Sequence, residues 1–505
     1  MGIVFRQSVK NLIIVAFGAV LGALVLWLST KYITKQGFGY IRSIGVYAVI
    51  LSQLLLMGLN STLIVFTHRL AGDERKRKLL LSLTLILPAF FAGIFTIFYF
   101  VFRTWILRHY QAEDVAFATR YFAWLPLFVF FFIYMTILEQ YLGSQMKVAV
   151  SAFMREILVR VLNIILIILF ALGYISLYAL ITGTVLIAGL PMIIFLFISF
   201  KTPGFGFSFR LRDFSLKEYK EIAHFAWYHY LLGAALILMA LMDSALVPIY
   251  DHSGFQSAAP YAAANFIISF LLMPSKAFLP ASFAALAKDF AEDDMVSAKN
   301  LFTRASMNLL IPTVGIAIIL CCNLQNVVAI IGNGKDYTSV IKIFLILMAG
   351  SLINVATGIN DQVLSIANYY KFNFYVSVLL IGLLFLLIRT LVPRYGVYGA
   401  AWSSTSILIV FNVIKYIFVW KKLGMQPFSN KTWRVIIAAL PALAVGYFFP
   451  YLFDPARHVY VHTFIDATIR TALISVIYVG MLLWLKPSPD LTEYVGLIRQ
   501  NKRLF

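Results

Sequence analysis

Two apolar stretches decide the fold class: HFAWYHYLLGAALILMALMDSALVP (224–248) and YAAANFIISFLLMPSKAFLPASFAALA (261–287). Each can cross a bilayer, because about 20 apolar residues span the hydrocarbon layer. The first carries Asp243, and the second carries Lys276 between Pro274 and Pro280. A charge at this depth costs on the order of 3 kcal/mol and normally faces a bundle interior or a water-filled cavity. A polar cavity in a helical bundle is therefore expected. The alternative is that Lys276 extends to the cytoplasmic surface and Asp243 caps an outer helix end.

Composition agrees with a membrane protein. Of 505 residues, 62% are hydrophobic and 12% are charged, whereas soluble domains are about 45–50% apolar and about 25% charged. The adjacent Cys321 and Cys322 lie in an apolar run, which supports neither a metal site nor a disulfide framework. We expect an all-α polytopic protein of about 14 transmembrane helices, near 11–30, 43–66, 79–102, 118–141, 154–172, 175–200, 223–248, 261–287, 305–324, 338–360, 373–392, 397–420, 435–453 and 464–485.

Basic residues set the expected orientation. They gather in alternate connections, chiefly 67–78, 201–221 and 421–434, whereas the other connections hold few. Because cytoplasmic loops carry an excess of Lys and Arg, both termini are expected in the cytoplasm. The net charge of +20 then reflects topology, and no nucleic-acid partner is implied. The few basic residues expected in outer connections include Arg42, Arg103 and Arg108.

The chain is expected to contain two six-helix lobes and two appended helices. A Pro-Gly-Phe-Gly start and a charged amphipathic end mark 201–222 as a cytoplasmic linker with an interfacial helix. The expected parts are a first lobe at 1–200, a second lobe at 223–420, and two additional helices with a cytoplasmic tail at 421–505. The two halves contain similar short segments about 222 residues apart, such as GSQMK (143–147) and ANYYK (367–371). Duplicated halves are common in transporters, where substrate is handled at the interface between repeats.

Glycine placement carries a resemblance to a known family. The segments are the basic start Arg6–Lys10, QGFGYIRS (36–43), the interrupted second span MGLNSTLIVF (57–66) and YGVYGAAWSS (395–404). Together with the topology, they resemble the bacterial polysaccharide (O-antigen-type) flippases of the multidrug/oligosaccharidyl-lipid/polysaccharide exporter (MOP) superfamily. The related peptidoglycan-precursor flippases carry several arginines in the first two spans, and the core of the first span here carries none.

The resemblance implies a specific function. Two lobes would form a V, with spans one, two, seven and eight facing a central cavity. By alternating access, the protein would move a polyprenyl pyrophosphate-linked oligosaccharide to the outer leaflet of the bacterial cytoplasmic membrane, for cell-surface polysaccharide biosynthesis. Its partners would be the lipid-linked substrate, membrane lipids and other glycan-assembly membrane proteins.

Five residues are the candidate site. Lys276 is expected to bind the phosphates, since it offers a compact positive charge. Asn60, Asn265 and Asp243 are expected to bind the sugar hydroxyls, although Asn60 could instead bond across helices. Asp243 and Asp361 are candidates for coupling to H⁺ or Na⁺.

The other charges within spans are assigned structural roles. Glu156 and Arg160 stand four residues apart and are expected to pair. Lys415, Arg389 and Arg470 lie near span ends and are expected to extend toward the surface.

An enzyme is not expected, because the sequence has no nucleotide-binding loop, H-E-x-x-H or nucleophile elbow. No cofactor or metal is expected either. Two other functions remain open. One is a cation-coupled multidrug exporter of the same superfamily, which would rely on membrane carboxylates such as Asp243 and Asp361. The other is a membrane glycan polymerase or ligase, which usually needs a large outer loop, and the outer loops here are short.

Overall fold

The protein is helical throughout the part that the structure describes. The computed structural model describes residues 2–70, 72–145, 148–202, 204–332, 336–367, 369–453 and 460–488, so the expected tail at 489–505 lies outside it. No strand occurs in these ranges, which confirms the all-α expectation. The chain divides into two compact units, Met1–Ala259 and Pro260–Phe505. This boundary lies in a helix, and the expected lobe boundary at 201–222 stays a prediction.

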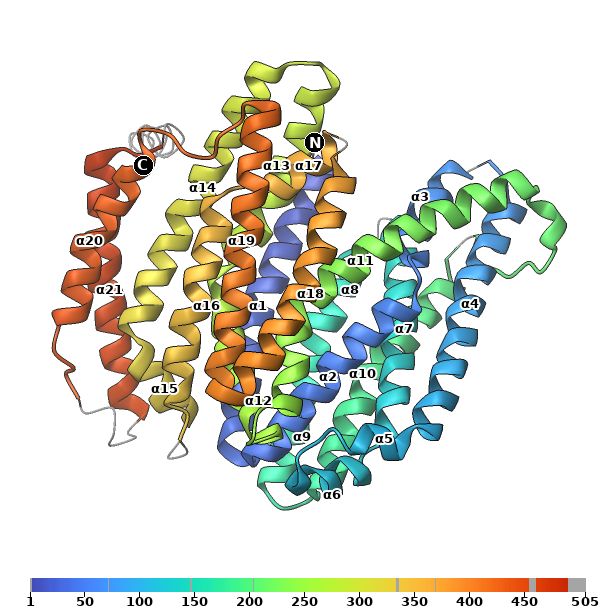
Figure 1. Ribbon diagram of the computed structural model, residues 1–505, viewed down its shortest axis with the longest axis horizontal. Coiled ribbons are helices and arrows are strands. Elements are labelled where there is room, and N and C mark those ends of the chain that lie inside the picture. Colours follow the sequence, from blue (N-terminus) through green and yellow to red (C-terminus); the bar gives the residue numbers. More distant parts are fainter. Residues whose placement is uncertain are drawn as a thin grey trace. The chain divides into compact units, whose positions relative to one another are not determined.

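The first unit contains the helices drawn from blue to green in Figure 1. Their bounds are α1 Gly2–Tyr32, α2 Lys35–Leu55, α3 Leu59–Arg69, α4 Glu74–Val101, α5 Arg103–Leu107, α6 Ala112–Arg120, α7 Trp124–Ser144, α8 Val148–Phe153, α9 Val159–Ala171, α10 Leu177–Phe200 and α11 Leu216–Tyr250. A π-helical turn, Met154–Leu158, joins α8 to α9. The unit ends within α12 (Phe255–Leu271).

The second unit continues from α12. Its further helices are α13 Met273–Ala291, α14 Met295–Cys322, α15 Leu324–Gly332, α16 Ser339–Ala356, α17 Asn360–Ile366, α18 Tyr370–Tyr395, α19 Val397–Leu423, α20 Thr432–Phe448 and α21 Tyr460–Leu485.

Every one of the expected spans falls on helix. Ten described helices are long and apolar enough to cross a membrane: α2, α4, α7, α10, α11, α14, α16, α18, α19 and α21. The remaining expected spans fall on α1, on α8 to α9, on α12 to α13, and on α20, which are interrupted or have shorter apolar parts. The protein is therefore a multi-pass membrane protein, and the count of about 14 spans stays a prediction.

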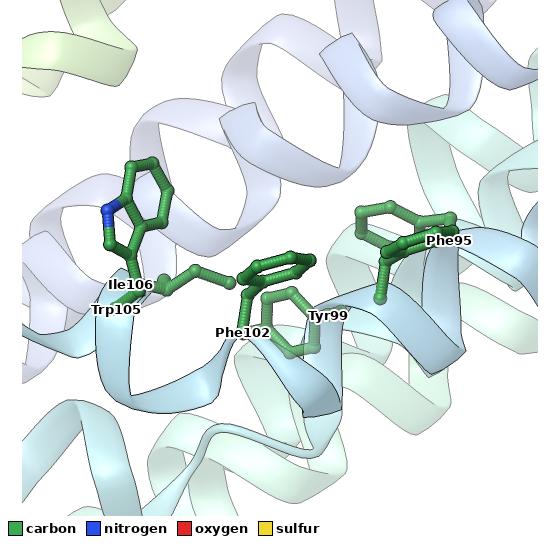
Figure 2. Close-up of a pocket in the computed structure, with 6 residues that line it drawn as sticks. Phe95, Tyr99, Phe102, Trp105 and Ile106 are labelled. Atoms are coloured by element: carbon green, nitrogen blue, oxygen red, sulfur yellow. The ribbon is translucent and has the colours of Figure 1, made fainter.

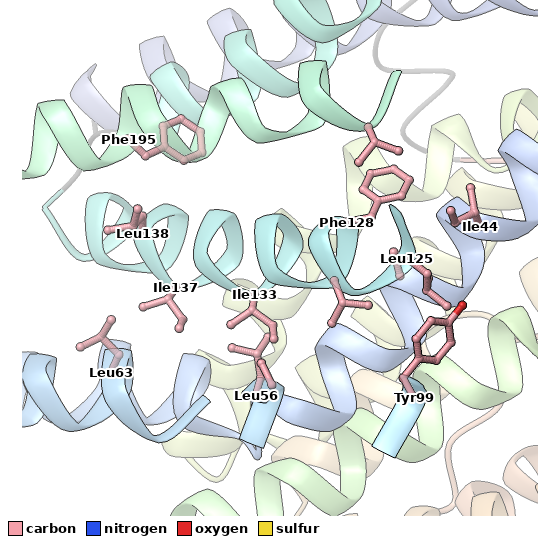
Figure 3. Close-up of a cluster of buried hydrophobic side chains, with 14 of the residues drawn as sticks. Ile44, Leu56, Leu63, Tyr99, Leu125, Phe128, Ile133, Ile137, Leu138 and Phe195 are labelled. Atoms are coloured by element: carbon pink, nitrogen blue, oxygen red, sulfur yellow. The ribbon is translucent and has the colours of Figure 1, made fainter. Parts of the chain in front are cut away.

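Helix α7 is the centre of the first unit's core. Val129, Ile133 and Ile137 repeat every four residues and are fully buried, which places them on one face of the helix. Figure 3 shows this helix between Leu56 and Leu63 on one side and Phe195 of α10 on the other. Both faces of α7 are packed, so it forms the fixed wall against which α2, α3, α4 and α10 are arranged.

The second span is broken where the sequence places the interruption. Helix α2 ends at Leu55 and α3 begins at Leu59, while Met57 and Gly58 have φ angles of 47° and 73°. A Cβ atom on Gly58 would lie 2.1 Å from the Ala226 carbonyl oxygen of α11. Only glycine adopts this backbone conformation without strain and leaves room for the neighbouring helix. The break therefore brings α3 and α11 into close contact.

The linker is held against the first unit. Ser215 and Glu218 form a capping box at the start of α11, and Lys76 binds Glu218 at 2.6 Å. The Ser208 N–H donates to the Ser82 hydroxyl of α4 at 2.9 Å. The expected interfacial helix is accordingly a short 3₁₀ turn, Leu211–Asp213, followed by the charged first turns of α11.

Helices α20 and α21 enclose a buried ion pair. Arg470, 1% exposed, binds Asp466 at 3.3 Å and donates at 2.8 Å to the carbonyls of both Gly446 and Phe449. The expectation that Arg470 extends to the surface is wrong, because its partners lie around it inside the unit. Asp466 also accepts a 2.6 Å bond from the Asn326 amide of α15.

Candidate functional site

A cavity with a few polar lining groups lies within the first unit, among helices that are long and apolar enough to cross a membrane. Its volume is about 350 Å³, which falls within the range of about 300–1,000 Å³ typical of small-molecule sites. Most of the wall is apolar, and the polar lining groups are Ser29, Arg42, Asn163 and Thr184. The apolar lining comes from α1, α2, α7, α9, α10 and α11: Val25, Ile33, Phe38, Ile41, Gly45, Val46, Val49, Phe128, Phe132, Ile167, Leu180 and Leu241.

Arg42 is the cation of this cavity, and it lies within helix α2 and not in the outer connection expected from the sequence. Helix α2 begins at Lys35, with Thr34 capping it by accepting the Gly37 N–H at 3.2 Å. Arg42 is thus seven residues into the helix, or about 10 Å along its axis. The first residues of this helix are only weakly apolar, so the apolar pattern of the sequence does not show where the helix begins.

No described carboxylate pairs with Arg42. Its guanidinium lies 5.2 Å from the centre of the Phe38 ring, and none of the ion pairs among the described residues includes it. An arginine without a counter-ion retains its planar fork of donors, which matches phosphate and carboxylate oxygens. The cavity is therefore suited to an anionic group.

The neighbouring arginine of span five is neutralised. Arg160 binds Glu156 at 2.5 Å and also donates to the Gly18 carbonyl of α1. The expected pairing of Glu156 with Arg160 is confirmed. A Cβ on Gly18 would lie 2.8 Å from the Glu156 Cβ, so α1 and span five pack closely here. This pair ties two cavity walls together and leaves Arg42 as the lining cation.

The cavity also offers oxygen atoms. The Asn163 amide donates to Val159 at 2.8 Å and the Thr184 hydroxyl donates to Leu180 at 2.9 Å, each within its own helix. The Asn163 amide oxygen and the Thr184 hydroxyl oxygen remain as acceptors, and the Asn163 amide keeps a second N–H donor. This arrangement suits a ligand that combines an anion with hydroxyl groups.

Asp243 lies near this cavity along the same helix. It is buried in α11, its carboxylate accepts the Ser244 N–H at 2.5 Å, and Leu241 lines the cavity two residues earlier. The Tyr47 hydroxyl of α2 donates to the Ala245 carbonyl at 3.0 Å, which joins the two helices at this level. Asp243 stands seven residues before the end of α11, or about 10 Å along the axis. Its distance from the end of α11 thus resembles the distance of Arg42 from the start of α2.

Asn60 lies elsewhere in the first unit. It is half-buried in the first turn of α3, directly after the break at Gly58. Its amide oxygen is buried and has no hydrogen-bond partner among the described residues. Asn60 is not among the residues that line the cavity. Its role in sugar binding stays a prediction.

Lys276 and Asn265 belong to the second unit. Helix α12 ends at Leu271 and α13 begins at Met273, so the break lies directly before Pro274 and puts Lys276 in the first turn of α13. Lys276 is exposed and Asn265 is half-buried. The candidate substrate-binding residues are thus divided equally between the two units, and their shared role stays a prediction.

Asp361 forms the centre of a polar cluster in the second unit. The Lys415 ammonium binds its carboxylate at 2.9 Å, and the Asn373 amide donates to it at 3.3 Å. The Lys415 side chain is only 2% exposed and that of Asp361 is 47% exposed. The expectation that Lys415 extends to the surface is therefore wrong. Both polar atoms of the adjacent Asn360 side chain are buried without a described partner.

Comparison with known proteins identifies the fold. No protein-family model matches the sequence, and no curated protein does. Among solved structures, the lipid II flippase MurJ in an inward closed conformation aligns with a TM-score of 0.73 at 16% identity, covering 94% of this chain and 100% of that one.

Two other transporters align over less of the chain. A mutant of the Vibrio cholerae MATE transporter VcmN has a TM-score of 0.57 at 12% identity, covering 83% of this chain and 97% of that one. A MOP superfamily transporter from Pyrococcus furiosus has a TM-score of 0.56 at 14% identity, covering 83% and 96%. The expected resemblance to the exporter superfamily is thus confirmed at the level of the fold.

Proposed function

We propose that this protein is a flippase for a polyprenyl pyrophosphate-linked oligosaccharide, working by alternating access in cell-surface polysaccharide biosynthesis. The observation that carries the proposal is Arg42, a cation without a described carboxylate partner in a membrane-depth cavity. A cavity that binds cationic drugs does not require an unpaired guanidinium, whereas a cavity that binds a pyrophosphate requires a positive charge. The setting is the bacterial cytoplasmic membrane, with both termini in the cytoplasm.

The remaining candidate residues complete the proposal. Arg42 and Lys276 would each bind a phosphate oxygen at some stage of transport. Asn60, Asn265 and Asp243 would bind sugar hydroxyls. The six-helix lobes at 1–200 and 223–420 would move against each other to open the substrate path to either side.

The test is binding of the lipid carrier with and without its phosphates. Native mass spectrometry of the full-length protein would compare polyprenyl pyrophosphate with polyprenol. Hydrogen bonds to a charged partner contribute about 1.5–3 kcal/mol, so Arg42→Ala should weaken pyrophosphate binding by about 10- to 100-fold. Arg42→Lys should retain part of the affinity, and polyprenol binding should stay unchanged in both variants.

A matched control separates this effect from general charge loss. Arg389→Ala removes an exposed arginine of α18 in the second unit, and it should leave pyrophosphate binding as in the parent protein. If Arg42→Ala binds polyprenyl pyrophosphate with unchanged affinity while correctly folded, the proposed phosphate role of this cavity is wrong.

A cation-coupled multidrug exporter is the second candidate, and the Asp361 cluster favours it. Asp361 is half-exposed, binds an ammonium, and is adjacent in sequence to Asn360, whose side-chain amide has no partner among the described residues. Such a carboxylate could exchange its partner with H⁺ or Na⁺ during a transport cycle, with Asp243 as a second coupling residue. Drug efflux by cells that overproduce the protein, abolished by Asp361→Asn, would support the exporter. Unchanged drug sensitivity together with polyprenyl pyrophosphate binding would support the flippase.

A further inference from the structure

An aromatic groove follows one face of α4 and α5, away from the polar cavity. Its wall consists of Phe95, Phe98, Tyr99, Phe102, Trp105 and Ile106, which enclose about 420 Å³. These positions recur every three or four residues, so they line one side of a nearly continuous helix. Figure 2 shows the rings of Phe95, Tyr99 and Phe102 following one another toward Trp105.

The groove has the length of a lipid chain. Ten residues separate Phe95 from Trp105, or about 15 Å along the helix axis, and this equals half of the roughly 30 Å hydrocarbon layer. Phe98 and Trp105 are 56% and 61% exposed. Trp105 stands at the end of the apolar helix, where tryptophan is enriched at membrane interfaces. The groove therefore runs from the headgroup level toward the middle of the bilayer.

A basic pocket adjoins the interfacial end of the groove. Its volume is about 380 Å³, and it is lined by Arg103, Thr104 and Leu107 of α5, by Arg108 directly after α5, and by Val115 of α6. Both arginines are exposed, and neither takes part in any ion pair among the described residues.

A stack of rings connects the two pockets. Tyr99 of the groove stacks on Phe122 with 4.0 Å between ring centroids, and the Arg103 guanidinium lies 5.6 Å from the Phe122 centroid. Arg103 is thus held next to the groove wall. An apolar channel that ends at two arginines complements a molecule with an acyl chain and an anionic headgroup.

We propose that α4 and α5 form a binding site for an anionic glycerophospholipid. One acyl chain lies along the aromatic groove, and the phosphate and headgroup lie between Arg103 and Arg108. With a cytoplasmic N-terminus, this end of α4 faces the outer leaflet. The site is separate from the cavity that contains Arg42, so the proposal does not depend on the transported substrate.

Brominated lipids test the site through Trp105. The full-length protein is reconstituted with dibrominated phosphatidylglycerol or dibrominated phosphatidylcholine, and the quenching of tryptophan fluorescence is compared. Trp105→Phe identifies the local part of the signal. We expect this part to show a preference for phosphatidylglycerol. Each arginine near a membrane surface contributes about 1 kcal/mol to anionic-lipid attraction, so Arg103→Ala and Arg108→Ala should each lower the preference about fivefold.

Two comparisons make the result decisive. Arg389→Ala, which removes an exposed arginine of the second unit, should leave the preference at Trp105 unchanged. A preference at Trp105 that survives loss of both arginines would overturn the proposal, and so would equal quenching by the two lipids in the parent protein. Millimolar inorganic phosphate should not displace the lipid; if it abolishes the preference, the arginines bind free anions and no lipid site exists.

Discussion

The ion pair of Asp361 with Lys415 should respond unequally to loss of its two partners. The Lys415 side chain is 2% exposed, whereas that of Asp361 is 47% exposed. Asp361→Asn leaves an ammonium buried without its counter-ion, and breaking a buried pair in this way costs about 3–5 kcal/mol. Lys415→Met leaves a carboxylate that water can solvate, so the cost should approach that of a surface pair, about 1 kcal/mol or less.

Two neighbours reduce the larger cost. The Lys415 ammonium lies 3.8 Å from the centre of the Phe411 ring, and a cation on an aromatic face gains about 1–2 kcal/mol when desolvated. The asparagine also keeps an oxygen that can accept the lysine. We therefore expect Asp361→Asn to lower the free energy of unfolding by about 2–3 kcal/mol. The double variant Asp361→Asn/Lys415→Met should recover most of this loss.

Reversible unfolding of the purified protein in mixed micelles measures these differences, and transport assays run on the same variants. A stable double variant that transports normally would assign the pair a structural role, whereas a stable but inactive one would support coupling through Asp361. The reasoning fails if Lys415→Met destabilises the protein as much as Asp361→Asn does.

Three other predictions concern topology, substrate and the break in span two. Single cysteines at 67–78 and 421–433 should be shielded from an impermeant outside reagent and those at 252–257 should react, whereas outside labelling of 67–78 would reverse the orientation. Lys276→Ala should abolish complementation of a flippase-null strain at normal membrane levels, with Lys276→Arg partly active; full complementation by the alanine variant would exclude the phosphate role. Gly58→Ala should lower stability by about 1–3 kcal/mol, because it adds a Cβ at a left-handed backbone position. Unfolding that is unchanged from the parent would show that the α3–α11 contact relaxes at no cost.

The fold could be predicted because each span is long and apolar. The limits agreed to within several residues for most spans, and the interruption of span two was expected at MGLNSTLIVF (57–66), as part of the resemblance to the flippase family. The start of span two was missed, since the sequence around Phe38 and Tyr40 mixes aromatic with polar residues and lowers the mean hydropathy. That error placed Arg42 in a connection instead of in helix α2 and hid the cavity's cation.

The partners of charged residues could not be read from the sequence. Position along a span gives depth but not the direction in which a side chain points. Lys415 and Arg470 lie near the ends of the spans expected from the sequence, and both are buried because other helices supply carboxylate or carbonyl partners. Glu156 and Arg160 were predictable because their spacing places them on one face of the same helix.

The enclosed Arg470 also has a consequence for biogenesis. At the centre of an inserting helix, arginine and aspartate each cost about 2.5–3.5 kcal/mol, and α21 carries both within one turn. Pairing with Asp466 offsets part of this cost inside the helix, but the remaining guanidinium donors are satisfied by carbonyls at the end of α20. Helix α21 is long and apolar enough to cross a membrane, but the Arg470 guanidinium reaches these carbonyl partners only when α20 is present. We therefore expect α20 and α21 to insert into the membrane together. Truncation between these two helices would leave the carbonyl groups at the end of α20 without the Arg470 guanidinium that donates to them.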